Sequence, residues 1–218
     1  MDSFDVGETD RLLTTTRTVR RRLDLTAPVD LSEVRDALRV ALQAPSNSNR
    51  QAWRWILITD PDVRGQVAGI YRRAYDELAS PTSVAAPSGE DALDRLLAST
   101  DHLARVLDQV PLLVIPCVLD RLAPDAPTRK AANLFGGIYP AVWSLQLALR
   151  TRGYGSALTT MHLAYEAEVA AILGIPDSVT QVGLLPVARF TGDTFGAAER
   201  APVEEVSFSD RWGEPLRS

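Results

Sequence analysis

Hydrophobic residues along the chain form two patterns. Some gather in short continuous runs, and others recur with the period of a helix. Four short apolar stretches have the length expected of strands or extended segments, and three of them are strong. These stretches cover 53–59, 110–119, 156–161 and 181–190. Apolar residues that recur every three or four positions predict amphipathic helices in the intervening segments. The helices are expected at 9–16, 31–43, 63–78, 90–107, 130–151 and 165–173, with loops at 80–89 and 121–128.

The helix expected at 130–151 is the longest and the least polar of the set. It contains Gly136, Gly137 and Pro140, which are poor helix residues. Glycine allows another backbone to approach closely, and proline can kink a helix. A helix that is apolar on nearly all sides lies either in the centre of a core or at a dimer interface.

The order of these elements favours an α+β fold. The strong strands are few and widely separated in sequence, so a few central strands clasped by helices fit better than a doubly wound sheet. The chain has 218 residues, of which 45% are hydrophobic, and this is enough for one sizeable core. The irregular segment 191–218 contains Trp212 and Pro215. These residues favour a tail that packs against another surface rather than a free one, and a partner subunit is a candidate for that surface.

Composition excludes several classes of protein. The formal net charge of −5 argues against general nucleic-acid binding. The single cysteine, Cys117, cannot form an internal disulfide, which favours a reducing compartment. No apolar run approaches the roughly 18–20 residues of a membrane span, and the acidic N-terminus lacks the pattern of a signal peptide. We therefore expect a cytoplasmic protein with no membrane partner.

Two polar stretches are candidates for binding chemistry. The first has four arginines within the six residues 17–22, which repel one another unless an anion relieves them. Guanidinium groups suit a phosphate, although a solvated charge run is the alternative. The second, Ala44-Pro45-Ser46-Asn47-Ser48-Asn49-Arg50-Gln51-Ala52-Trp53, joins a helix to a strand. It offers backbone N–H groups, hydroxyls and carboxamides to a polar, planar, anionic ligand.

The usual side-chain constellations of enzymes are absent from the sequence. Only two histidines occur, His102 and His162, and no metal-binding cluster, Gly-x-Ser-x-Gly elbow or Walker loop is present. His162 is either a ligand-facing residue or a turn histidine without a role. An enzyme with this sequence would take its chemistry from an organic cofactor, so no catalytic side chain and no metal ligand is assigned.

Several motifs, taken in order, resemble the FMN-dependent nitroreductase family. Arg17-Thr18-Val19-Arg20 is similar to the family's Arg-Ser-x-Arg, and the stretch 44–53 to its Ala-Pro-Ser-x-x-Asn-x-Gln-Pro-Trp. Arg152-Gly153-Tyr154-Gly155-Ser156-Ala157 resembles the family's Gly-Leu-Gly-Thr segment. Leu173-Gly174-Ile175-Pro176 and Arg200-Ala201-Pro202-Val203-Glu204-Glu205-Val206 resemble its closing motifs. Together these segments span about residues 16–206.

The resemblance implies a nitroreductase-like α+β fold with an antiparallel-type sheet clasped by helices. It also implies a homodimer in which the C-terminal extension 191–218 is swapped onto the partner, with FMN at the interface. The chain 1–218 would form one FMN-binding domain, in which about 80–133 is a variable lid region.

The resemblance also assigns roles to individual residues. Arg17, Arg20 and Arg200 would hold the FMN phosphate, helped by Thr18, with Arg21 in the same cluster. Pro45, Ser46, Asn47 and Asn49 would face the flavin from the neighbouring subunit. Thr159 and Thr160 match the place where backbone N–H groups meet flavin N5. Thr160-Met161 replaces the acidic-Gly or Gly-Gly pair of many members, which changes the surroundings of N5.

The activity implied is reduction of electron-poor acceptors, such as nitroaromatics or quinones, by NAD(P)H through ping-pong hydride transfer. Two alternatives stay open. One is a flavin-dependent dehydrogenase of a biosynthetic intermediate, or another flavin enzyme of the same fold such as a dehalogenase. The other is a non-enzymatic protein that sequesters FMN.

Overall fold

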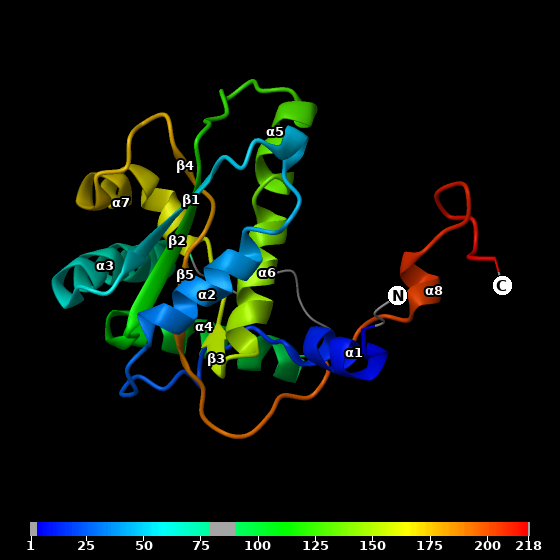
Figure 1. Cartoon of the computed structure of the whole chain (residues 1–218), viewed down its shortest axis with the longest axis horizontal. Coiled ribbons are helices and arrows are strands. Elements are labelled where there is room, and N and C mark those ends of the chain that lie inside the picture. Colours follow the sequence, from blue (N-terminus) through cyan, green and yellow to red (C-terminus); the bar gives the residue numbers. More distant parts are fainter. Residues whose placement is uncertain (1–3, 79–89, 218) are drawn as a thin grey trace.

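The computed structural model describes residues 4–78 and 90–217, except for the side chains of residues 90–92. The loop expected at 80–89 therefore lies outside the described residues. In the described parts a small β-sheet lies between two layers of helices (Figure 1).

The described sheet has five short strands. They are β1 (Trp53–Ile58), β2 (Leu112–Val118), β3 (Tyr154–Ser156), β4 (Thr180–Gln181) and β5 (Leu185–Arg189). The order is β1-β2-β5-β3, β4 also pairs with β2, and all of these pairings are antiparallel. The expected antiparallel α+β architecture is confirmed.

The structure differs from the two C-terminal strand predictions in the bounds of the strands. The segment predicted at 156–161 forms a strand only as β3, which ends at Ser156. The segment predicted at 181–190 is divided into β4 and β5. The division arises because Leu184 forms an isolated bridge with Thr159, with N–H···O distances of 2.8 and 3.0 Å, rather than with β2.

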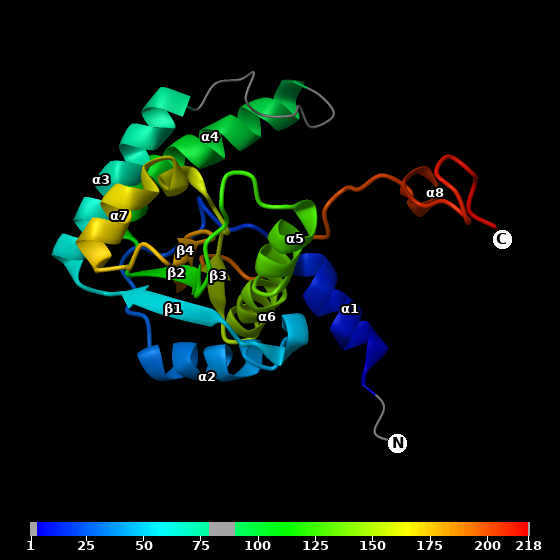
Figure 2. The same cartoon turned by 90° about the horizontal axis from the view of Figure 1, so that it is seen from above.

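Helices cover both faces of the sheet, as Figure 2 shows. One face is covered by α2 (Leu31–Ala41), α5 (Thr128–Gly136) and α6 (Tyr139–Arg150). The other is covered by α3 (Pro61–Leu78), α4 (Glu90–Val106) and α7 (Glu166–Leu173). Within the described ranges, no helix combines the length and apolar character needed to cross a membrane.

Strand β2 joins the two halves of the core. All seven of its residues are buried, and alternate side chains point to opposite faces of the sheet. Ile115 and Cys117 pack in the cluster with α3 and α7, whereas Leu112 and Val114 pack with α2 and α6. Burial raises the pKa of the Cys117 thiol to about 12, so this thiol stays protonated and packs as a small apolar residue.

The long helix predicted at 130–151 is two helices, so that prediction was wrong in its continuity. Helix α5 ends at Gly136 and α6 begins at Tyr139. A Cβ added to Gly137 would lie 2.9 Å from the Asn133 carbonyl oxygen, so the break requires glycine there. Pro140 lies in the first turn of α6, where a helix needs no N–H donor.

Helix α1 (Val6–Thr15) and the C-terminal segment with α8 (Val203–Val206) project from the same side of the body (Figure 1). Val203, Val206 and Trp212 on this segment are exposed, Trp212 to 92%. The tail therefore presents apolar side chains that this chain does not cover. The swapped dimer stays a prediction.

The segment 17–22, which we call the arginine-rich segment, is held along the edge of the sheet. Thr18 forms a parallel bridge with Ser156, and the Val19 N–H donates to the Ser156 carbonyl oxygen at 2.9 Å. Val19 is buried, whereas Thr18 is exposed and Arg20 is half-buried. Gly155 permits this approach, because an added Cβ would lie 2.9–3.2 Å from the Val19 side chain.

We predict that Gly155→Ala destabilises the fold by about 1–3 kcal/mol, because the new methyl group overpacks against Val19. Gly69→Ala is the matched control, since Gly69 lies in α3 with nothing within 4 Å of an added Cβ. That control should gain about 0.5–1 kcal/mol of helix stability. Urea unfolding measures both values, and equal stability of the two variants would contradict the prediction.

His162 is fully buried in the short 3₁₀ turn that precedes α7. Among the described residues neither ring nitrogen has a well-aligned hydrogen-bond partner, although Gln181 lies near. Burial lowers the pKa of His162 to about 4, against the opposing influence of the Glu166 carboxylate. The imidazole is therefore neutral at pH 7.

This burial predicts a loss of stability in acid. Because the folded pKa is about 4 and the ordinary value 6.5, the unfolded chain takes up the proton first as the pH falls. His162 should cost about 3 kcal/mol of unfolding free energy between pH 7 and pH 4. His162→Leu lacks this cost and keeps Glu166. The unfolding free energy of the variant, relative to that of the unaltered protein, should therefore rise as the pH falls. Parallel urea-derived profiles for the two proteins would refute the assignment.

Candidate functional site

A cavity of about 670 Å³ opens beside the arginine-rich segment. Its walls come from the end of α1, the segment 16–20, helices α4 and α6, and the start of the C-terminal extension. The lining residues are Thr16, Arg17, Thr18, Arg20, Leu96, Trp143, Gln146, Leu158, Phe195, Gly196 and Arg200. We call this the cation cavity, because three of these residues are arginines and none is acidic.

The three arginines of the cation cavity have no acidic partner among the described residues. In the part of the chain that the structure describes, Arg17, Arg20 and Arg200 form no ion pair. Arg17 donates to the Gly196 carbonyl oxygen at 3.1 Å, and Arg200 to that of Glu199 at 2.9 Å. Like charges gathered without a counter-charge favour an anionic ligand, and guanidinium donors suit phosphate oxygens.

Arg20 is the most enclosed of the three. Its guanidinium donates to the Ser99 hydroxyl on α4 at 3.2 Å. Burial lowers its pKa, and the nearby Tyr71 hydroxyl opposes that shift. An arginine retains its charge at neutral pH even after such a shift, so Arg20 places a partly desolvated positive charge in the wall. A partly desolvated charge attracts an anion more strongly than a fully hydrated one.

The rest of the cavity wall is largely apolar. It is formed by Leu96, Trp143, Leu158 and Phe195, and Trp143 is 42% exposed although it belongs to the apolar helix α6. Gln146, one turn further along α6, is buried and donates to the Ser156 hydroxyl at 3.2 Å. This wall suits the flat, mostly apolar body of an aromatic ligand whose anionic end meets the arginines.

Arg21 and Arg22 lie beside the cation cavity rather than in it. Both line a smaller adjoining cavity of about 180 Å³, together with Thr18, Arg20 and Ser99. Arg22 has a structural role, because it donates to the carbonyl oxygens of residues 191 and 194 at 2.6 and 2.9 Å. Arg21 is exposed, and its side chain forms no hydrogen bond or ion pair with the described residues.

The polar stretch at 44–52, which we call the Asn-rich loop, lies elsewhere on the chain. Ser46 and Asn47 line a separate cavity of about 130 Å³ between the start of β1, helix α5 and the link from α5 to α6. This cavity shares no lining residue with the cation cavity. Pro45 and Asn49 are exposed and line neither cavity. In a single chain, therefore, the structure does not bring this loop to the arginines.

The same loop holds a strained backbone. Ser48, Asn49 and Gln51 have φ values of 49°, 53° and 47°, which non-glycine residues rarely adopt. The Gln51 N–H donates to the Ser46 hydroxyl at 3.2 Å, and the Gln51 carboxamide to Asn49 at 3.0 Å. Strain of this kind clusters at functional sites, and the binding role of the loop stays a prediction.

Thr159 and Thr160 follow Leu158, which lines the cation cavity. The Thr159 N–H already donates to the Leu184 carbonyl oxygen at 3.0 Å, and its hydroxyl lies 2.9 Å from that of Tyr71. Thr160 is exposed at the start of the 3₁₀ turn. The backbone of Thr159 is thus engaged by its bridge to Leu184, which leaves Thr160 as the exposed member of the pair.

The structure therefore brings together Arg17, Thr18, Arg20 and Arg200 of the residues predicted from sequence. Sequence reasoning missed the remaining cavity residues as site residues. Gln146 had a detectable signal, because it is a polar residue between leucines in the apolar segment 130–151. Leu96 and Ser99 had none, since they are ordinary positions of an amphipathic helix.

Solved structures share this fold. One is iodotyrosine deiodinase bound to FMN and 3-iodo-L-tyrosine, at 23% identity and a TM-score of 0.67, covering 91% of this chain and 95% of that one. Another is the FMN- and NADPH-dependent nitroreductase NfnB from Sphigopyxis sp. strain HMH, at 17% identity and a TM-score of 0.66, covering 96% and 100%. A third is a BluB-like flavoprotein from Clostridium difficile 630, at 18% identity and a TM-score of 0.66, covering 96% and 100%.

Family membership rests on the sequence. The model of the Nitroreductase family matches residues 13–189, which contain the arginine-rich segment, the Asn-rich loop and all five described strands. Members of this family are FMN-dependent oxidoreductases. The chain belongs to the Nitroreductase family.

Proposed function

We propose that the protein is an FMN-dependent NAD(P)H oxidoreductase that reduces electron-poor acceptors, such as nitroaromatics or quinones, by a ping-pong mechanism. The cation cavity carries this proposal: within the described ranges, three arginines without carboxylate partners face a cavity that has an apolar wall and no acidic lining residue. That combination fits FMN, which joins a phosphate to a flat ring system. An anion in this cavity would also relieve the repulsion between Arg17 and Arg20, whereas Arg22 already donates to backbone carbonyl oxygens.

The chain's residues divide the work of binding. Arg17, Arg20 and Arg200 would hold the phosphate, with the exposed Thr18 hydroxyl as a further donor. Trp143 and Leu158 would pack against the ring system, and Arg21 would add positive charge at the rim. The exposed Thr160 backbone would face the reactive edge of the ring. When bound, FMN would supply the hydride chemistry that no side chain here offers.

The second half of the site would come from a partner subunit. Pro45, Ser46, Asn47 and Asn49 lie away from the arginines of their own chain, as a shared site in a homodimer requires. The exposed apolar side chains of the C-terminal extension would be covered by the same partner. We therefore propose a homodimer with two equivalent FMN sites.

No side chain is assigned a chemical step. The protein's part is to fix the cofactor, exclude water and present the same open face first to the donor and then to the acceptor. Use of one face by both molecules in turn is what the ping-pong scheme requires. The apolar wall and the cationic character of the described lining residues favour planar acceptors that carry partial or full negative charge.

We predict that Arg17→Gln and Arg200→Gln each weaken FMN binding by about 10- to 100-fold, because each removes a charge-assisted hydrogen bond to the phosphate. Arg39→Gln is the matched control, since Arg39 is an exposed arginine of α2 paired with Asp36. FMN fluorescence titration of the full chain measures all three. Equal affinities of these variants and the control would contradict the phosphate role.

Acceptor assays separate the alternatives. Oxidation of NADPH that accelerates on adding nitrofurazone or a quinone is expected of the proposed reductase. Bound FMN that NADPH reduces, with no acceleration by these acceptors, would favour a flavin-dependent dehydrogenase or a dehalogenase. Bound FMN that neither NADH nor NADPH reduces would favour a sequestering protein.

A further inference from the structure

Helix α4 contributes directly to the wall of the cation cavity. Leu96 lines this cavity and Ser99 lines the adjoining one, and the two residues lie three positions apart on one face of the helix. The Ser99 hydroxyl accepts a hydrogen bond from Arg20 at 3.2 Å. Further along α4, Leu103 and Ala104 are fully buried in the core. The helix is therefore anchored at its C-terminal end and reaches the site from its middle.

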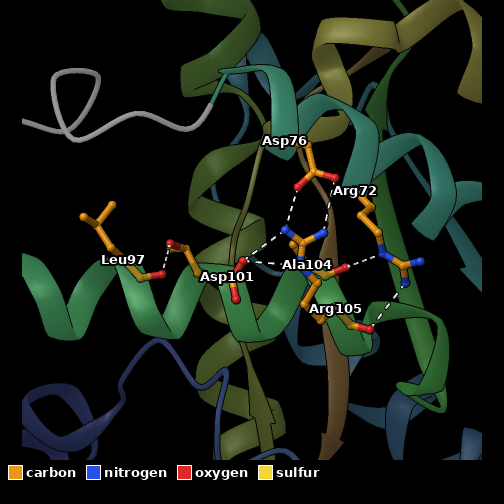
Figure 3. Close-up of polar contacts among 7 residues, drawn as sticks. Arg72, Asp76, Leu97, Asp101, Ala104 and Arg105 are labelled. Atoms are coloured by element: carbon orange, nitrogen blue, oxygen red, sulfur yellow. Dashed lines mark hydrogen bonds and ion pairs between the residues drawn. The ribbon is translucent and has the colours of Figure 1, made fainter.

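A polar network fastens α4 to α3, as Figure 3 shows. Arg105 on α4 contacts both carboxylate oxygens of Asp76 on α3, at 2.6 and 3.2 Å. The same guanidinium lies 3.2 Å from Asp101, one turn earlier in α4. One arginine thus joins the two helices through a two-pronged contact, which fixes orientation as well as distance.

A second arginine, which lies on α3, also binds the end of α4. Arg72 on α3 donates to the carbonyl oxygens of Ala104 and Arg105, at 3.2 and 3.3 Å, where α4 ends. It also contacts the Asp108 carboxylate at 3.3 Å. We call the set formed by Arg72, Asp76, Asp101, Arg105 and Asp108 the α3–α4 network. Its members are half-exposed, so each pair alone is weak and their common geometry gives the effect.

From these contacts we propose that the α3–α4 network positions helix α4 as a wall of the anion site and thereby sets how long FMN stays bound. This inference rests on the proposed function. Arg20 is shared between Ser99 and the anion, and the Ser99 hydroxyl can accept from Arg20 while its own proton is donated to a phosphate oxygen. Loosening α4 would withdraw Ser99 and Leu96 from the ligand together.

Thermodynamic linkage makes the coupling reciprocal. If docking of α4 strengthens FMN binding, FMN must stabilise docked α4 by the same factor. Amide hydrogen exchange along residues 93–106 should therefore slow when FMN is added, beyond any change in α7. Arg105 and Asp76 act as positioning residues in this scheme, since neither lines the cavity.

The chain offers a matched control for the network. Arg73, the residue after Arg72 on α3, pairs with Glu168 of α7 at 2.5 Å and stacks over Tyr165. The Arg73–Glu168 pair is also an exposed ion pair that starts from α3, but it joins α3 to α7 rather than to α4. Arg73→Gln should therefore cost similar stability without affecting the cation cavity.

The test compares FMN dissociation rates, followed by the recovery of free FMN fluorescence after dilution of the loaded full-length protein. Arg105→Gln is expected to raise the rate about 5- to 10-fold, and Arg73→Gln less than twofold. Arg105→Lys keeps the charge but loses the two-pronged contact, so its rate should fall between them. Ser99→Ala should raise the rate too, and Arg105→Gln should add little in the Ser99→Ala background.

Each outcome decides the inference. Equal rates for Arg105→Gln and Arg73→Gln, or unchanged exchange of α4 amides on FMN binding, would overturn the coupling while leaving the FMN site intact. Failure of the unaltered protein to bind FMN would overturn the proposed function, and the inference with it. If Arg105→Gln does not fold, the rates of Arg105→Lys and Ser99→Ala decide the question.

Discussion

The attachment of the arginine-rich segment to the edge of strand β3 is the contact on which the rest of the site depends. Gly155 lets Val19 approach, and the Val19 N–H bonds to Ser156. This register turns Val19 into the core and leaves Arg17 and Arg20 at the cavity. The sheet thus holds like charges together that would otherwise separate in solvent, and their mutual repulsion is relieved when an anion binds.

The distribution of the other predicted residues suggests that one chain holds only part of a site. The cation cavity and the cavity behind the Asn-rich loop share no residue, and the apolar C-terminal extension projects away from the body. In a dimer, one interface could bring the Asn-rich loop of one copy to the arginines of the other and also cover the apolar extension. Helix α4 also contributes to the candidate site. Its Ser99 accepts a hydrogen bond from Arg20, and its Arg105 binds Asp76 of α3.

Much of the fold could be predicted from the sequence because continuous apolar strands and amphipathic helices carry strong local patterns. The break at Gly137 could not, since Pro140 is equally compatible with a kink and with the first turn of a new helix. The arginines could be proposed as anion ligands from their clustering. Ser99 and Leu96 could not, because their contact with residues about 80 positions earlier exists only after α4 packs on the body.

The decisive measurement is the visible absorption spectrum of the purified protein, recorded without oxygen before and after NADPH is added. We expect a flavin band that bleaches on reduction, either as purified or after addition of FMN and dialysis. A protein that retains no flavin after that treatment would contradict the phosphate-binding role of Arg17, Arg20 and Arg200, and with it the proposed function.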